Sequence, residues 1–247
     1  RSFLVKLVMS WTMLTILLVF SGTVCAQPQY GGVLQYGLSG ELYNLDPNTG
    51  STTYTTFNVY SQVYSGLVRL GSTENGTIDV LPDLAESWET TDSQVWTFHL
   101  RKGGKWHKGD DFTADDVVFT FELIMDPENA AHRYGDVSAT VDKVDALDPY
   151  TVRFTLKGPN VGFLSVIALP YVKIVSKGWF ALGKDLRDTM MGTGPFKFES
   201  REEEVRLTLV RNDDYFIPGI PYLDGINYIP YKDDTARITA LRTGAVD

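Results

Sequence analysis

The chain has 247 residues, of which 43% are hydrophobic and 21% are charged, a composition typical of a globular protein. Its 22 lysines and arginines stand against 31 aspartates and glutamates, so the formal net charge is −9. Because no basic cluster interrupts this acidic background, nucleic acid is not expected as a partner. The single cysteine, Cys25, excludes an intramolecular disulfide and a cysteine-based zinc site.

The first 26 residues have the pattern of an export signal. Arg1 and Lys6 precede an apolar run over residues 7–20, and small residues follow up to Ala26. We predict a secretory signal peptide over 1–26, cleaved after Ala26. A membrane span would need roughly 20 apolar residues, and this run is shorter. Acylation of Cys25 as a lipoprotein is the alternative, although Val24 before it is large for that signal. Either way the protein is expected in the periplasm or at the cell surface.

Strand and helix patterns alternate along the rest of the chain. Apolar residues at every second position predict strands over 33–38, 95–100, 151–156 and 205–209. Helical spacing predicts helices over 56–70, 113–125 and 234–243. Thr113 and Asp116 form a carboxylate variant of the capping box, and Gly244 suits a helix C-terminus. The chain is therefore predicted to be a mixed α/β protein.

Motifs for catalysis or metal binding are missing from the sequence. There is no Gly-x-Ser-x-Gly elbow, Walker loop or His-Glu-x-x-His helix. The spacing of His99, His107 and His132 matches no metal site. The aspartates at 110–111 and 115–116 lack the oxygen pattern of an EF-hand, and they are interpreted as a solvated turn and a helix start. We expect no catalytic residues, no metal and no cofactor, and we predict that the protein is not an enzyme.

Several ordered blocks resemble one known family. They are Leu81-Pro-Asp-Leu-Ala-Glu-Ser-Trp-Glu89, residues 96–107, Phe112-Thr-Ala-Asp-Asp-Val-Val-Phe119, Gly192-Thr-Gly-Pro-Phe196, Asn212-Asp-Asp-Tyr215, residues 219–224 and residues 240–247. Together they resemble the family 5 extracellular solute-binding proteins, the peptide- and nickel-type receptors of bacterial ABC importers. The resemblance covers residues 31–247. Lys108 and the pair Tyr215-Phe216 depart from the family pattern without affecting the assignment.

This resemblance implies an α/β, periplasmic-binding-protein-like fold of class II, a two-lobed venus flytrap whose lobes close on a ligand. Residues 27–70 and 185–247 would form the mixed sheet of lobe I, and 71–184 an additional subdomain of that lobe. Family members are about twice as long, so the second lobe is expected to be absent. The implied function is capture of a di- or oligopeptide, delivered by a monomer to ABC transporter permease subunits in the membrane.

The resemblance also places a cleft-facing loop after Asp46-Pro47. Polar ligand contacts are expected from Ser51, Thr52, Thr53 and Tyr54, with Tyr43 behind them. An ordinary polar surface loop is the alternative for each of them. Bound peptides would be held through their main chain, like an added strand. If the intact receptor binds its ligand with a dissociation constant near micromolar, a lobe that supplies half of the binding free energy would bind only near millimolar. No tight ligand is therefore expected for residues 27–247.

Other functions stay open at this point. The same receptor fold could take a nickel chelate, heme, an opine or a sugar instead of a peptide. A secreted enzyme would need a site assembled in space that sequence spacing does not show. A chaperone-like surface protein would bind partner chains through an exposed cleft face.

Overall fold

The computed structural model describes residues 28–50, 52–73 and 75–247. The predicted signal peptide, with Cys25, lies outside the described residues, and so does Ser51. Residues 31–247 form one compact unit, which is described below. Within the described ranges, no helix is both long and apolar enough to cross a membrane.

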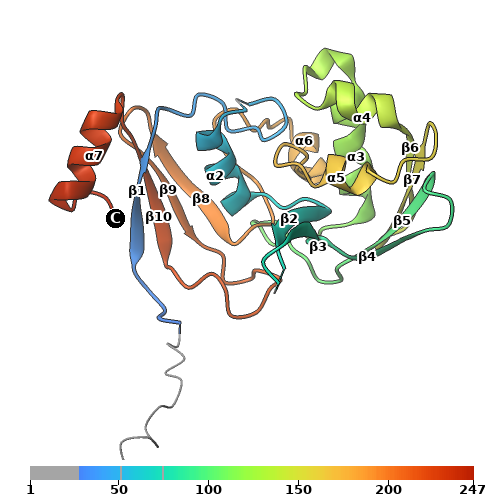
Figure 1. Ribbon diagram of the computed structural model, residues 1–247, viewed down its shortest axis with the longest axis horizontal. Coiled ribbons are helices and arrows are strands. Elements are labelled where there is room, and N and C mark those ends of the chain that lie inside the picture. Colours follow the sequence, from blue (N-terminus) through green and yellow to red (C-terminus); the bar gives the residue numbers. More distant parts are fainter. Residues whose placement is uncertain (1–27, 51, 74) are drawn as a thin grey trace, which may run out of the picture. The chain divides into compact units, whose positions relative to one another are not determined.

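One sheet combines the start and the end of this unit. Its order is β1(Val33–Leu38), β10(Gly225–Pro230), β9(Arg206–Arg211) and β8(Phe196–Glu202). β1 and β10 are parallel, with Val33 opposite Gly225, and the other pairs are antiparallel. Figure 1 shows α2(Tyr54–Val63) and α7(Asp234–Thr243) on opposite sides of this sheet. After β1 ends at Leu38, the next element along the chain is α2, which starts at Tyr54.

A second sheet belongs to the middle of the chain. Its order is β4(Ala85–Thr90), β5(Val95–Leu100), β7(Thr151–Leu156) and β6(Val141–Asp148), all antiparallel. α3(Ala114–Met125) packs on β6 and β7. The shorter elements around it are η1(Pro127–Asn129), α4(Tyr134–Thr140), α5(Phe163–Ile167) and α6(Lys177–Ala181). A hairpin of β2(Val68–Ser72) and β3(Ile78–Pro82) connects α2 to β4.

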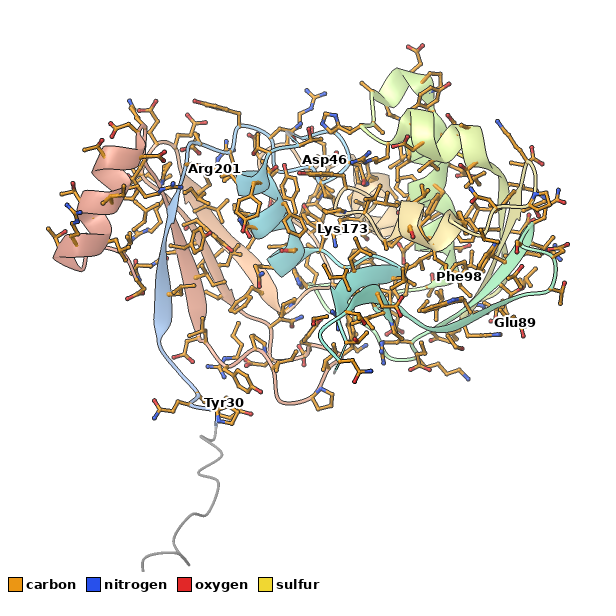
Figure 2. All side chains as sticks on the ribbon, viewed as in Figure 1. Tyr30, Asp46, Glu89, Phe98, Lys173 and Arg201 are labelled. Carbon is orange, nitrogen blue, oxygen red and sulfur yellow. The ribbon has the colours of Figure 1, made fainter. Side chains whose placement is uncertain are left out.

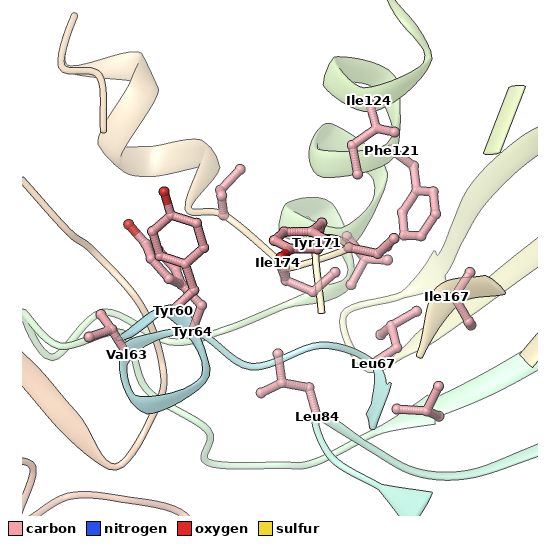
Figure 3. Packing of buried hydrophobic residues seen from close by; sticks show 14 of the residues in the cluster. Tyr60, Val63, Tyr64, Leu67, Leu84, Phe121, Ile124, Ile167, Tyr171 and Ile174 are labelled. Atoms are coloured by element: carbon pink, nitrogen blue, oxygen red, sulfur yellow. The ribbon is translucent and has the colours of Figure 1, made fainter. Parts of the chain in front are cut away.

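A continuous apolar core runs between α2, α3 and the second sheet. Figure 3 shows its central part, where Tyr60 and Tyr64 of α2 lie near Tyr171 and Ile174, and Phe121 and Ile124 extend from α3. Trp96 and Trp106 are 5% and 3% exposed, and Trp88 is half-buried, so these conspicuous rings pack the fold. Large buried rings contribute most of the apolar area of such a core.

The predicted helix over 56–70 is wrong in its extent. α2 starts at Tyr54, ends at Val63, and is followed by a strand from Val68. The reason lies at Gly66, whose N–H donates to the Asp83 carboxylate at 2.9 Å. A Cβ at Gly66 would approach the Val68 carbonyl oxygen to 2.9 Å, so this turn requires glycine. The chain thus leaves the helix here and enters the hairpin.

Candidate ligand-binding segment

The candidate segment, residues 44–54, begins with side-chain-to-backbone turns at Asn44 and Asp46. The Asn44 side-chain oxygen accepts from the Asp46 N–H at 2.9 Å. One Asp46 carboxylate oxygen accepts from the N–H groups of Asn48 and Thr49 at 2.8 and 3.3 Å. Asparagine and aspartate are favoured in turns because their short side chains replace backbone partners in this way. The sequence Asn-Leu-Asp-Pro-Asn-Thr therefore folds locally into a fixed turn.

Two tyrosines of α2 hold this turn from the core side. The Tyr60 hydroxyl donates to the Asn44 carbonyl at 2.6 Å, and the Tyr64 hydroxyl donates to the Leu45 carbonyl at 3.1 Å. Both side chains are at most 1% exposed, and burial raises the pKa of each phenol, so both remain donors at physiological pH. A Cβ at Gly50 would collide with the Tyr60 hydroxyl and with the Asp46 carbonyl. The turn and the helix below it therefore fix each other.

Residues far away in the sequence complete the segment. The buried Asn48 amide pairs with Lys173 in both directions, donating to its carbonyl at 3.1 Å and accepting from its N–H at 3.3 Å. The His132 N–H donates to the Asn48 carbonyl at 3.0 Å, and the Tyr171 hydroxyl donates to the Thr53 carbonyl at 3.1 Å. Figure 2 shows Asp46 and Lys173 in the central part of the described unit. The segment is thus held both by α2 and by residues 132–173 of the middle of the chain.

The predicted site residues lie in different settings. Tyr43 and Tyr54 are 80% and 75% exposed, and Thr52 and Thr53 are also exposed. The Thr53 hydroxyl caps α2 by accepting from the Thr56 N–H at 3.3 Å, so it is already engaged. Ser51 lies outside the described residues. Thr52 to Tyr54 are adjacent at the start of α2, whereas no hydrogen bond or ring contact in the described part of the chain joins Tyr43 to them.

Thr52 differs from its neighbours in its backbone. Among the described residues, no hydrogen bond uses its N–H, its carbonyl or its hydroxyl. The carbonyls of Asn44, Leu45, Asn48 and Thr53, in contrast, all accept bonds from within the fold. An exposed N–H and an exposed carbonyl without a partner among the described residues are what an extended peptide needs for main-chain pairing.

The chemistry of this segment is that of polar recognition. The hollow beside it, bounded by Asp46, Asn48, Thr49 and Leu123 among others, has a volume of about 50 Å³. This is far below the few hundred Å³ of an enclosed small-molecule site. Among the described residues, no group of three metal-ligating side chains is found. His132 faces the Gly50 carbonyl with its Nε2 atom, so this imidazole supports the segment. A ligand here lies on an open surface.

Sequence reasoning missed Asn48, His132 and Tyr171 as supports of the segment. Asn48 lay inside the predicted loop, and its amide type was the only local signal. Its partner Lys173 is 125 residues away, so no spacing pattern connects the two.

Comparison with known proteins identifies the family. The family described as bacterial extracellular solute-binding proteins, family 5 middle, matches residues 79–247. The chain belongs to this family, which comprises solute-binding receptors and is not a family of enzymes. Its fold is the mixed α/β fold of periplasmic binding proteins, as the sequence analysis predicted.

The relatives found include receptors named for small peptides. Di/tripeptide-binding protein 1 of Pseudomonas aeruginosa (strain UCBPP-PA14) is 31% identical, over 92% of this chain and 46% of the relative. The dipeptide-binding protein of Escherichia coli (strain K12) is 32% identical, over 83% of this chain and 41% of the relative. The chain thus spans less than half the length of these two relatives.

Solved structures agree with this assignment. The periplasmic binding protein DppA from Helicobacter pylori, in complex with the peptide STSA, has a TM-score of 0.80 and 32% identity, covering 91% of this chain and 47% of that one. AgaA from A. tumefaciens R10, in complex with agropinic acid, has a TM-score of 0.78 and 35% identity, covering 87% and 43%. One fold therefore holds a peptide in one of these neighbours and agropinic acid in the other.

Proposed function

We propose that this chain is part of an extracytoplasmic receptor that captures a di- or oligopeptide and delivers it to an ABC importer. The observation that carries this proposal is the hydrogen-bonded turn over residues 44–49, followed by the exposed Thr52, whose N–H and carbonyl have no partner among the described residues. This segment follows the carboxyl end of β1, which is parallel to β10. Ligands of α/β sheets bind outside the carboxyl ends of parallel strands, because the loops diverge there.

Family membership and the names of the relatives support the transport role. In this proposal the receptor is a monomer, its partners are permease subunits in the membrane, and it catalyses no reaction. Residues 1–26 direct the receptor to the periplasm or cell surface. Cys25 is lipidated only if the signal peptide is cut immediately before Cys25 and not after Ala26. Residues 27–70 and 185–247 belong to one part of the first lobe, and 71–184 to its additional subdomain.

An opine-type ligand is the second candidate. The AgaA structure, which holds agropinic acid, is 35% identical to this chain, about as similar as the peptide-binding DppA structure at 32%. Both ligands present carboxylates and hydrogen-bonding groups, so the exposed hydroxyls of Tyr43, Thr52 and Tyr54 suit either one.

The test is a titration followed by amide NMR of the ¹⁵N-labelled chain. A dipeptide such as Ala-Leu is expected to shift the amides of residues 48–54 and 131–133, with a dissociation constant of about 1 mM. Tyr54→Ala should weaken this binding several-fold, since an exposed aromatic ring contributes much of a small contact surface. Ile78→Ala is the matched control, because Ile78 is 78% exposed on the separate β3 hairpin.

Two results would contradict the proposal. One is a saturable peptide shift confined to amides outside these two stretches. The other is equal binding by the Tyr54→Ala and Ile78→Ala variants together with no response at Thr52. Preference for agropinic acid over the dipeptide at the same amides would favour the second candidate.

A further inference from the structure

A second cavity lies away from segment 44–54. It has a volume of about 440 Å³, within the range of small-molecule sites. Its walls come from α2, from β2, from Asp83 between β3 and β4, from residues 168–173 after α5, and from the loops before β8 and β10. β8, β10 and β1 run in the same direction, so this cavity is near their amino ends, whereas segment 44–54 follows the carboxyl end of β1. Tyr64, which lines the cavity, directs its hydroxyl to Leu45 of that segment.

The cavity is lined by a lysine whose ammonium group has no partner in the described part of the chain. Lys173 lines it, and this residue is only 8% exposed. No hydrogen bond or ion pair in the described part of the chain involves its Nζ atom. Burial lowers the pKa of Lys173, while the more distant Asp83 carboxylate opposes this effect. Most of the Lys173 side chain is buried, so an anion that enters the cavity would pair with its ammonium in a partly desolvated setting, where a charge-assisted bond is strong.

The charges around Lys173 favour an anion. Arg69 and Lys173 are the cationic residues of the wall, and Asp83 is its carboxylate. Asp83 is already bound by the Gly66 N–H at 2.9 Å, and it forms no ion pair within 4.0 Å with either cation in the described residues. Burial also raises the pKa of the Tyr215 phenol, so this group is neutral. The wall therefore carries one net positive charge.

The remaining wall is mainly apolar, formed by Phe57, Leu70, Ala168, Pro170, Pro195, Ile217 and Ile220. We propose that this cavity binds a small organic carboxylate with an apolar body, whose carboxylate pairs with Lys173 beside Arg69. A phosphate dianion fits less well, because the wall supplies a single net charge and the Asp83 carboxylate opposes a second negative charge. None of the residues that line this cavity belongs to segment 44–54, although the Lys173 backbone also pairs with Asn48 of that segment. The proposal does not depend on the function proposed above.

The test uses 4-methylpentanoate as the probe, titrated calorimetrically into the chain at pH 7. We expect saturable binding with a dissociation constant on the order of 1 mM. The uncharged analogue 4-methylpentanamide should bind at least about tenfold more weakly, because it lacks the charge-assisted bond to Lys173. Tyr54→Ala, which should weaken peptide binding, should leave binding of the carboxylate unchanged, because Tyr54 does not line this cavity. This result distinguishes the cavity from the peptide segment.

Two variants examine the cavity itself. Lys173→Met keeps an unbranched side chain that is one atom shorter, removes the charge, and should weaken binding at least about tenfold. Lys232→Met is its control, because the Lys232 side chain is 85% exposed and pairs with Glu204 at 3.3 Å. Ser61→Leu fills the cavity from a half-buried position of α2 and should also weaken binding, while Lys173 remains. The proposal is overturned if 4-methylpentanoate does not bind, if the amide binds equally well, or if folded Lys173→Met and Ser61→Leu both retain wild-type affinity.

Discussion

His107 should make the stability of this protein depend on pH. Its imidazole lies between two backbone groups of the turn before β8. The Gly192 N–H donates to Nδ1 at 3.4 Å, and Nε2 lies 3.1 Å from the Gly194 carbonyl oxygen. Because an N–H only donates and a carbonyl only accepts, this geometry requires neutral histidine with its proton on Nε2. A second proton on Nδ1 would meet the Gly192 N–H.

The magnitude follows from the pKa of this imidazole. Burial lowers the pKa of His107 from 6.5 to about 4, assisted by the nearby Lys197 charge and opposed by the Gly194 carbonyl. The unfolded chain binds a proton more readily than the folded one, so stability is fully present above pH 6.5 and is lost as the pH falls toward 4. A shift of this size corresponds to about 3 kcal/mol in total, of which about 2 kcal/mol is lost between pH 7.5 and pH 5.

The assay is urea unfolding at pH 7.5 and pH 5 for the wild type and His107→Gln. Glutamine retains a donor for the Gly194 carbonyl and does not titrate. The wild type should therefore lose about 2 kcal/mol more than the variant over this interval. His99→Gln is the control, because the His99 imidazole is half-exposed and lies 3.7 Å from Glu89. It measures how the loss of an exposed histidine changes the pH dependence of stability. If wild type and His107→Gln lose stability in parallel, the neutral imidazole does not stabilise the fold.

Two further substitutions test how the second sheet is held together, and both are measured by urea unfolding at pH 7.5. Phe154→Ala should cost about 3–5 kcal/mol, because this fully buried ring contacts Phe98, Phe121 and Phe163 at centroid distances of 5.3, 4.8 and 5.4 Å. A loss below about 1 kcal/mol would contradict this packing. Asp116→Ala should cost about 3 kcal/mol, because its carboxylate accepts from the N–H groups of Thr113 and Lys177 and from the Trp106 indole at 3.0, 2.9 and 3.2 Å. Asp115→Ala on the same helix, with a side chain 69% exposed and 3.8 Å from Lys177, should cost less than about 1 kcal/mol, and equal losses for the two would refute the capping role.

Local signals were sufficient where a helix carries its own start and stop. The predicted helix over 113–125 corresponds to α3, and the Thr113 N–H does donate to Asp116 as the capping pattern implied. The prediction over 234–243 matches α7, which ends at Gly244 in the left-handed conformation. Asp116 was interpreted as part of a solvated turn and helix start, yet it is only 5% exposed. Its partners, Trp106 and Lys177, come from loops that a periodicity pattern does not place.

Strands with weak alternation were missed for a physical reason. β6 spans Val141–Asp148 and is rich in charged residues, and its register shifts twice against β7. Each shift breaks the two-residue period that identifies a half-buried strand. The supports of segment 44–54 were missed for a different reason. They depend on tertiary pairs such as Asn48 with Lys173, and a single sequence contains no signal that connects these two positions.

The hydrogen bonds of residues 44–48 determine what segment 44–54 can offer to a ligand. The carbonyls of Asn44, Leu45 and Asn48 are fixed by Tyr60, Tyr64 and the His132 backbone, so little ordering remains when a ligand arrives. A preorganised surface gains affinity because it loses less conformational entropy on binding. The same bonds occupy most of the backbone acceptors that a peptide could use. In the proposed function, recognition on this side therefore depends on Thr52 and on the exposed rings of Tyr43 and Tyr54, groups that contact many sequences with little discrimination.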